Sequence, residues 1–268
     1  MFEQQQGTAL ITGASTGIGA IYADRLAHRG YDLILVARDG ARLDALAERL
    51  HTETGRTVEV LAADLTDRAD VARVEARLAN DANITLLVNN AGMSLTGNLL
   101  DTETAQVEKL IALNITAPTL LAGAAGKAFA ARKSGAIIML ASVLALAPES
   151  FDGVYSGSKA YVLALSQSLD AQFAELGLRV QAVLPGATRT EIWERSGKDI
   201  DALPADMVMD AGDLVDAALL GFDRGETVTI PPLADLGQWT ALQEARLAIA
   251  PNMSKRDVAP RYREAVPV

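Results

Sequence analysis

Short apolar runs alternate along the chain with longer segments in which apolar residues recur every three or four positions. The short runs are rich in Val, Ile and Leu and predict β-strands, whereas the longer segments predict amphipathic helices. We expect strands at residues 8–12, 33–37, 57–62, 84–88, 136–141 and 179–184, and a short seventh strand at 227–230. We expect helices at residues 18–29, 41–53, 68–79, 103–131 and 154–176, the fourth of them bent near Pro118.

The predicted strands are almost continuously apolar, with little alternation between apolar and polar positions. This pattern is typical of parallel strands that are covered by helices on both faces. Because helices separate the strands and crossovers are right-handed, the elements predict an α/β fold with a doubly wound parallel sheet. No linker-like segment divides the chain, so we expect a single domain over residues 1–268, with a lid at about 188–210 and a C-terminal extension at about 233–268.

The composition disfavours several classes of function. Acidic residues outnumber basic ones and give a formal net charge of −10, which argues against nucleic-acid binding. The absence of cysteine excludes disulfides, cysteine nucleophiles and thiolate metal sites. His28 and His51 lie in predicted helices without acidic clusters at ligand spacing, so we expect no metal site. The start of the chain does not resemble a signal peptide and no apolar run is long enough to cross a membrane, so we expect a cytoplasmic protein that binds no membrane.

A glycine-rich segment, Thr12–Gly19, lies between the first predicted strand and the first predicted helix. Such a turn lets the backbone approach a pyrophosphate, whose charge is favoured by the helix N-terminus. An ordinary tight strand-to-helix turn is the alternative, but three glycines in this stretch favour nucleotide binding. The chain has no Walker lysine motif, so a nucleotide triphosphatase is not expected. The candidate cofactor contacts in this turn are Gly13, Ser15, Thr16, Gly17, Ile18 and Gly19.

Tyr155 and Lys159 are four residues apart in a predicted helix and therefore lie on the same face. A nearby ammonium favours tyrosinate and lowers the pKa of a phenol, which makes the pair a candidate proton donor and acceptor. By itself the spacing also fits a plain amphipathic helix with a packed tyrosine and a solvated lysine.

Taken together, these motifs resemble the short-chain dehydrogenase/reductase family over about residues 8–190. The resemblance implies a Rossmann-type fold of about seven strands in the order 3-2-1-4-5-6-7, with helices on both faces. It also implies a homodimer or homotetramer. The matching motifs are T-G-x-x-x-G-x-G at Thr12–Gly19, N-N-A-G at Asn89–Gly92, the helix asparagine Asn114, the set Ser142, Tyr155 and Lys159, and the turn Pro185-Gly186.

The resemblance assigns a role to each residue of a catalytic set. Tyr155 is the general acid or base, and Lys159 lowers the Tyr155 pKa and binds the nicotinamide ribose. Ser142 orients the substrate oxygen, and Asn114 supports a water that relays protons. The resemblance further implies cofactor contacts from Asp64, Leu65, Asn90, Ala91, Gly92, Pro185, Gly186, Thr188 and Thr190, besides Tyr155 and Lys159. Thr66 and Asp67 also suit a helix cap, so Asp64 is expected to be partly structural.

The end of the second predicted strand bears on the choice of cofactor. Ala37 stands where family members that bind NAD carry an acidic residue, and Arg38 and Arg42 follow. Arginine pairs a 2′-phosphate bidentately, so these residues favour NADP(H) over NAD(H). Two alternatives stay open: both arginines are solvated surface charges, or Asp39 moves toward the ribose.

Only three residues separate Tyr155 from Lys159. Family members that reduce C=C bonds have a longer spacing, so the resemblance favours interconversion of a ketone or aldehyde with an alcohol. The candidate substrate contacts are mostly apolar and favour an apolar small molecule; they are Leu144, Phe151 and Trp193. The alternative function is a non-catalytic NADP(H)-binding sensor or scaffold on the same fold. A hydrolase is not expected, because neither histidine is placed to serve as the base of a serine nucleophile.

Overall fold

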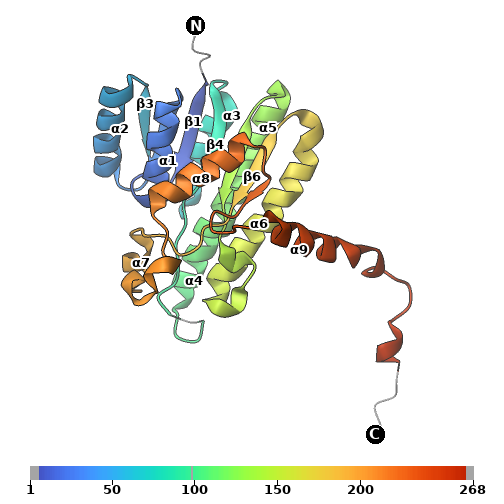
Figure 1. The fold of residues 1–268 in the computed structure, drawn as a ribbon. Coiled ribbons are helices and arrows are strands. Elements are labelled where there is room, and N and C mark those ends of the chain that lie inside the picture. Colours follow the sequence, from blue (N-terminus) through green and yellow to red (C-terminus); the bar gives the residue numbers. More distant parts are fainter. Residues whose placement is uncertain (1–5, 98, 264–268) are drawn as a thin grey trace. The chain divides into compact units, whose positions relative to one another are not determined.

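The computed structural model describes residues 6–97 and 99–263, so the expected domain ends at residues 1 and 268 lie outside the described residues. Seven parallel strands form one sheet in the order β3-β2-β1-β4-β5-β6-β7, which confirms the expected α/β architecture (Figure 1). The strands are β1 (Thr8–Thr12), β2 (Asp32–Ala37), β3 (Val58–Ala62), β4 (Ile84–Asn89), β5 (Ala136–Leu140), β6 (Arg179–Val183) and β7 (Val228–Thr229).

Helices cover both faces of the sheet. On one face α1 contacts α2 and α8, and on the other α5 contacts α3 and α6 (Figure 1). The helices are α1 (Gly17–His28), α2 (Gly40–Thr54), α3 (Arg68–Asn80), α4 (Thr104–Ile111), α5 (Ala117–Arg132), α6 (Gly153–Phe173), α7 (Ile192–Arg195), α8 (Ala211–Asp223) and α9 (Leu236–Ala248). Shorter turns of 3-10 type are Val143–Ala145, Pro148–Ser150, Ala174–Leu176, Ile200–Ala202, Ala205–Met207, Ala250–Asn252 and Pro260–Tyr262.

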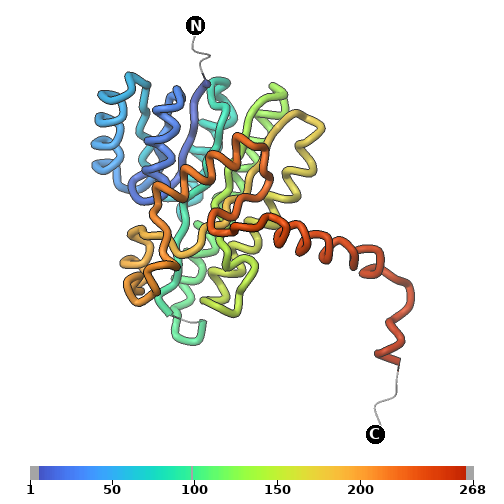
Figure 2. Tube along the Cα trace, viewed as in Figure 1, coloured from blue at the N-terminus to red at the C-terminus, as the bar shows by residue number. Residues whose placement is uncertain are grey.

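The core lies between the sheet and these two helical layers. Leu10, Ile34 and Leu87 of the central strands are almost fully buried. Continuous burial of this kind explains why the strands lack alternation between apolar and polar residues. Because every strand pair is parallel, all strands end at the same edge of the sheet, as the path of the chain shows (Figure 2).

The long fourth helix changes its hydrogen-bond pattern just before Pro118. A π-helical turn, Ala112–Thr116, joins α4 to α5, and Pro118 then lies at the start of α5. Proline lacks the N–H of a regular helical hydrogen bond, so an irregular turn before it is expected. Asn114 lies within this π-helical turn.

The joined stretch Thr104–Arg132 is long and apolar enough to cross a membrane by length and hydropathy alone, the one such stretch among the residues described. Core helices of water-soluble domains satisfy the same criteria. Leu110, Leu121 and Phe129 are fully buried, and α5 packs against β4 and β5. This packing accounts for the apolar composition of the stretch.

Helix α8 was not predicted from the sequence. The side chain of Asp210 caps it by accepting hydrogen bonds from the amides of Gly212 and Asp213. Leu214 and Val215 are buried in the core, and apolar residues recur at the helical spacing between the expected lid and the expected seventh strand. The helix therefore follows an ordinary cap signal and amphipathic pattern that the sequence analysis missed.

The chain divides into two compact units, Met1–Pro231 and Pro232–Val268. The first unit contains the complete sheet. The second contains α9, which was not among the expected helices, and two short 3-10 turns, Ala250–Asn252 and Pro260–Tyr262. The boundary lies next to residue 233, where a C-terminal extension was expected.

Candidate active site

The predicted site residues gather where the strands end. The glycine turn follows β1, the N-N-A-G segment follows β4, Ser142 follows β5 and the Pro185-Gly186 turn follows β6. In a doubly wound sheet, this carboxyl edge is where ligands bind. The strand order reverses between β1 and β4, and these two strands are neighbours in the sheet.

The glycine turn has room for backbone but not for side chains. Gly13 and Gly17 have positive φ angles of 68° and 54°, and a Cβ atom on Gly19 would lie 2.2 Å from the Gly13 carbonyl oxygen. Thr16 is the N-cap residue of α1, and its side chain makes no capping hydrogen bond. The first amides of α1 have no intrahelical partners and favour an anion, so this cradle fits a pyrophosphate.

The N-N-A-G segment ties β4 to the glycine turn. The Asn90 side-chain amide donates to the carbonyl oxygens of Thr12 (2.8 Å) and Gly13 (3.2 Å). The Thr12 hydroxyl in turn accepts from the backbone amides of Asn90 (3.0 Å) and Ala91 (3.1 Å). Asn90 therefore fixes the position of the cofactor cradle through its side chain. A Cβ atom on Gly92 would lie 3.5 Å from the Lys159 ammonium nitrogen.

Asn114 is almost fully buried within the π-helical turn. Its Oδ1 accepts from the Met93 amide (2.9 Å), and its Nδ2 donates to the Met93 carbonyl (2.8 Å) and the Ser158 hydroxyl (3.2 Å). A buried amide needs such partners, and here they join α6 to the segment after β4. π-helical turns are frequent at functional sites. The expected water relay remains a prediction.

Ser142, Tyr155 and Lys159 come together at the edge of β5. Asp152 caps α6 by accepting from the amides of Val154 and Tyr155, which fixes the start of the helix that carries Tyr155. Ser142 is near enough to Tyr155 to favour the ionised phenol, and its hydroxyl donates to the Pro185 carbonyl (3.5 Å). The Lys159 ammonium donates to the Leu140 carbonyl (2.7 Å) and lies 5.7 Å from the centre of the Tyr155 ring.

Burial determines the acid–base state of the pair in this structure. It raises the pKa of Tyr155 to about 12, against the nearby Ser142 hydroxyl, which acts in the opposite direction. Burial lowers the pKa of Lys159 to about 8. The net shift of the Tyr155 pKa is therefore upward in this structure, where the Lys159 ammonium is held at the Leu140 carbonyl, and the expected lowering by Lys159 stays a prediction.

The two arginines after β2 differ in their surroundings. Arg42 pairs with Asp39 (3.3 Å) and Glu191 (3.0 Å), and Asp39 also caps α2. Arg38 is exposed and makes no hydrogen bond or ion pair with any other described residue. Arg38 is therefore the available cation at this position, whereas Arg42 would have to leave two carboxylates.

Asp64 has a structural role after β3. Its carboxylate accepts from the amide (2.9 Å) and the hydroxyl (2.8 Å) of Thr66, while Asp67 caps α3. Leu65, beside it, is buried. The partly structural role expected of Asp64 is thus present, and its contact with an adenine ring stays a prediction.

The segment after β6 turns back over the glycine turn. Thr188 is buried and forms a backbone bridge with Met209, and the Trp193 indole donates to the Thr188 carbonyl (2.8 Å). A Cβ atom on Gly17 would lie 3.3 Å from the Thr190 side chain. Of the predicted substrate contacts, Phe151 packs edge-on against the Tyr155 ring (5.7 Å between ring centres), and Leu144 and Trp193 are half-buried.

Residues 7–201 of the chain match the family described as short chain dehydrogenase. The chain belongs to this family. An uncharacterized oxidoreductase of Staphylococcus saprophyticus is 32% identical over 231 residues, which are 86% of this short-chain dehydrogenase and 97% of the relative. The resemblance inferred from the sequence motifs is therefore confirmed.

Solved structures extend the likeness over nearly the whole chain. A short-chain dehydrogenase of Sphingobium yanoikuyae in complex with NADPH is 52% identical, with a TM-score of 0.94, over 96% of this chain and 100% of that one. The bulky-bulky ketone specific alcohol dehydrogenase of Comamonas testosteroni is 46% identical, with a TM-score of 0.90, over 97% and 99% of the two chains. This short-chain dehydrogenase is thus an NAD(P)-dependent oxidoreductase that acts on CH–OH or C=O groups.

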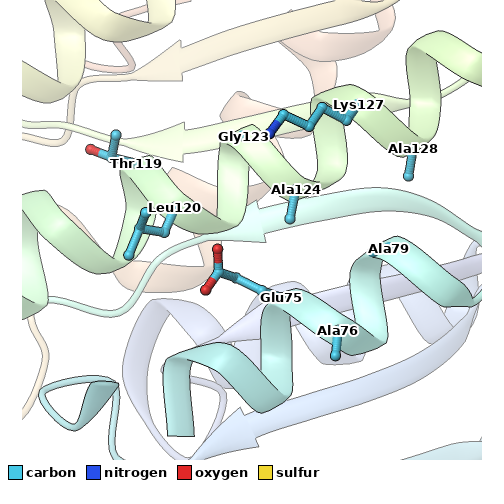
Figure 3. A pocket seen from close by; sticks show the side chains of 9 residues that line it. All are labelled: Glu75, Ala76, Ala79, Thr119, Leu120, Gly123, Ala124, Lys127 and Ala128. Atoms are coloured by element: carbon cyan, nitrogen blue, oxygen red, sulfur yellow. The ribbon is translucent and has the colours of Figure 1, made fainter. Parts of the chain in front are cut away.

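A hollow in the surface of this short-chain dehydrogenase lies between α3 and α5, away from the predicted site (Figure 3). Ala76, Gly123 and Ala124 line it, and Glu75 extends from α3 toward α5. Its lining includes none of the predicted catalytic or cofactor residues. This hollow is therefore separate from the residues predicted to carry the chemistry.

Proposed function

We propose that this enzyme interconverts a ketone or aldehyde with an alcohol and uses NADP(H) in preference to NAD(H). Tyr155 serves as the general acid in reduction and the general base in oxidation. Ser142 orients the substrate oxygen, Lys159 binds the nicotinamide ribose and favours the ionised Tyr155, and Asn114 supports a proton relay. The observation that carries the proposal is that Ser142, Tyr155 and the buried Lys159 ammonium come together at the carboxyl edge of the sheet.

The backbone cradle formed by Gly13, Gly17 and Gly19 supports the cofactor part of the proposal. When bound, the nicotinamide supplies or accepts the hydride. Arg38 binds the 2′-phosphate, because its exposed guanidinium makes no hydrogen bond or ion pair with another described residue and acts on Asp64 only through its charge. The NADPH complex of the Sphingobium relative agrees with this preference.

The substrate is a mainly apolar small molecule. Leu144, Phe151 and Trp193 supply apolar contacts around Tyr155, and Phe151 already packs against it. The Comamonas relative is named for bulky-bulky ketones, which suits an apolar site. We further propose that the enzyme is cytoplasmic and forms a homodimer or homotetramer. Sedimentation of the purified protein at micromolar concentration tests the oligomeric state.

The decisive experiment replaces the Tyr155 hydroxyl alone. Tyr155→Phe is expected to lower kcat with NADPH and an aryl ketone by about a hundredfold to ten-thousandfold, as for loss of a positioned general acid. Tyr161→Phe is the matched control, because it removes a hydroxyl from the same helix whose partner is Thr119. Its kcat is expected to stay within about twofold of the original.

Fluorescence titration with NADPH separates chemistry from cofactor binding. Tyr155→Phe is expected to bind NADPH nearly as well as the original chain while its turnover is lost. Full activity of Tyr155→Phe would contradict the mechanism. Tight NADPH binding by the original chain, with no turnover on any ketone, aldehyde or alcohol, would instead support a sensor or scaffold.

A further inference from the structure

The lid helix α7 ends in a turn that fixes the position of Lys198. Gly197 has a φ of 66°, its amide donates to the Glu194 carbonyl, and the Lys198 amide donates to the Trp193 carbonyl. These two bonds form the Schellman motif, in which a glycine in the left-handed region ends a helix. The backbone of Lys198 is therefore held in place although it lies beyond the helix.

The Lys198 side chain extends from this turn to the two segments around Tyr155. Its ammonium lies 3.6 Å from the centre of the Phe151 ring and 3.3 Å from the Ser94 hydroxyl, to which it donates. Phe151 in turn packs edge-on against Tyr155, with 5.7 Å between ring centres. One aromatic ring thus separates the ammonium from the proposed general acid.

Lys198 is a half-buried cation that makes no ion pair at contact distance in the described part of the chain, although it feels the charge of Asp152. The nearby Asp152 carboxylate is engaged by the amides of Val154 and Tyr155 at the start of α6. Burial lowers the pKa of Lys198, and the charge of Asp152 acts in the opposite direction. An ammonium removed from water gains most from an anion, and a hydroxyl and an aromatic face compensate it only in part.

We propose that Lys198 recognises an anionic group on the substrate, so that the enzyme acts on carbonyl compounds with an apolar body and a remote carboxylate. The inference rests on the proposed function, because it takes Tyr155 as the end of the site that binds the carbonyl. Phe151 lies between the two polar ends and contacts the apolar body.

The spacing limits the size of such a substrate. The Lys198 ammonium is 3.6 Å from the centre of the Phe151 ring, and that centre is 5.7 Å from the centre of the Tyr155 ring. Together these two distances set an upper limit on the separation of the ammonium from the Tyr155 ring. At about 1.2 Å per bond of an extended chain, a carboxylate roughly four to six bonds from the carbonyl carbon reaches Lys198. Keto acids such as 5-oxohexanoate, 6-oxoheptanoate and 4-acetylbenzoate meet this requirement.

The experiment compares each of these three acids with its neutral methyl ester. With NADPH, at least one acid is expected to have a kcat/KM about tenfold or more above that of its ester, the gain typical of a charge-assisted hydrogen bond. Lys198→Met keeps the aliphatic stem and removes the charge, so it is expected to abolish the preference while the esters react as before. Lys198→Arg keeps a cation and is expected to retain much of the preference.

A purely structural role of Lys198 gives a different result. If the residue only holds the lid against Phe151 and Ser94, Lys198→Met lowers kcat/KM for acids and esters alike, and the inference is overturned. Turnover of esters without any preference for the acids in the original enzyme also overturns it. If neither acids nor esters are reduced although NADPH binds, the proposed function fails together with this inference.

Discussion

The buried charge of Lys159 lowers the stability of the folded chain at neutral pH. Its ammonium is almost fully buried, and burial lowers its pKa to about 8. In the unfolded chain a lysine has a pKa of about 10.4, so between these values the unfolded chain binds a proton that the folded chain does not. Stability therefore rises with pH through this window, and the full cost of the buried charge, about 3 kcal/mol, is present below pH 8.

Lys159→Met is accordingly expected to stabilise the fold at neutral pH. The net gain is about 1–3 kcal/mol, because the Leu140 carbonyl loses its partner. The midpoint temperature of thermal unfolding at pH 7 should be several degrees higher for Lys159→Met than for the original chain. This difference between the two chains should shrink toward zero by about pH 10. Lys127→Met, at an exposed lysine on α5, is the control and is expected to change little at either pH. Destabilisation of Lys159→Met at pH 7 would contradict the assigned cost of burial.

Arg38 is the residue on which the proposed preference for NADP(H) depends. Arg38→Ala is expected to weaken NADPH binding by about tenfold to a hundredfold and to leave NADH binding nearly unchanged, because only NADPH has the 2′-phosphate. Isothermal titration with both cofactors measures this. Arg49→Ala is the control, since Arg49 lies on α2 and pairs with Asp24 and Glu53. An equal loss for both cofactors would rule out the phosphate contact.

The seven strands and the helices that precede β6 were predictable, and the helices that follow β6 were not. Six of the seven strands and the first helices have apolar patterns that match their burial, whereas β3 has no fully buried residue and is marked by its alternating Val58-Glu59-Val60 pattern. Helix α8 had the same signals, with Asp210 as cap, but followed a segment that resembled a lid. In α9 no described residue is buried, so no core periodicity marks it.

The candidate site was predictable in its members but only partly in their contacts. Residue type and order identified Ser142, Tyr155 and Lys159. The direction of the Tyr155 pKa depends on burial, which no local pattern reveals. Similarly, the pairing of Arg42 with Glu191 joins residues far apart in sequence, and Lys198 occurs in no motif.

The glycine turn between β1 and α1 is an element whose geometry can be tested directly. Gly19→Ala would place its Cβ 2.2 Å from the Gly13 carbonyl, so the turn must move. We expect NADPH binding to weaken at least tenfold, since the amides that face the pyrophosphate shift. Gly40→Ala is the matched control at the start of α2, where the nearest atom to a Cβ is 3.9 Å away. Unchanged NADPH titration of Gly19→Ala would show that the turn does not hold the cofactor.

At the scale of the whole molecule, function is concentrated in one of the two units. The unit Met1–Pro231 contains every strand and every predicted site residue. In the unit Pro232–Val268, large apolar side chains such as Leu236, Leu242 and Leu247 are exposed. A unit of fewer than about 40 residues without a core is not stable by itself.

A chain that ends at Pro231 is therefore expected to fold and to bind NADPH within about twofold of the full chain, because it keeps the whole core and the cofactor cradle. The separate peptide 232–268 is expected to be mostly unfolded by circular dichroism, since isolated helices of about this length are marginal in water. Removing the exposed apolar side chains should also reduce binding of the dye ANS by the folded protein. Thermal unfolding and NADPH titration of both chains measure the first expectation. A loss of more than a few degrees on truncation would mean that the apolar side chains of α9 are covered in the assembled protein and contribute to its stability.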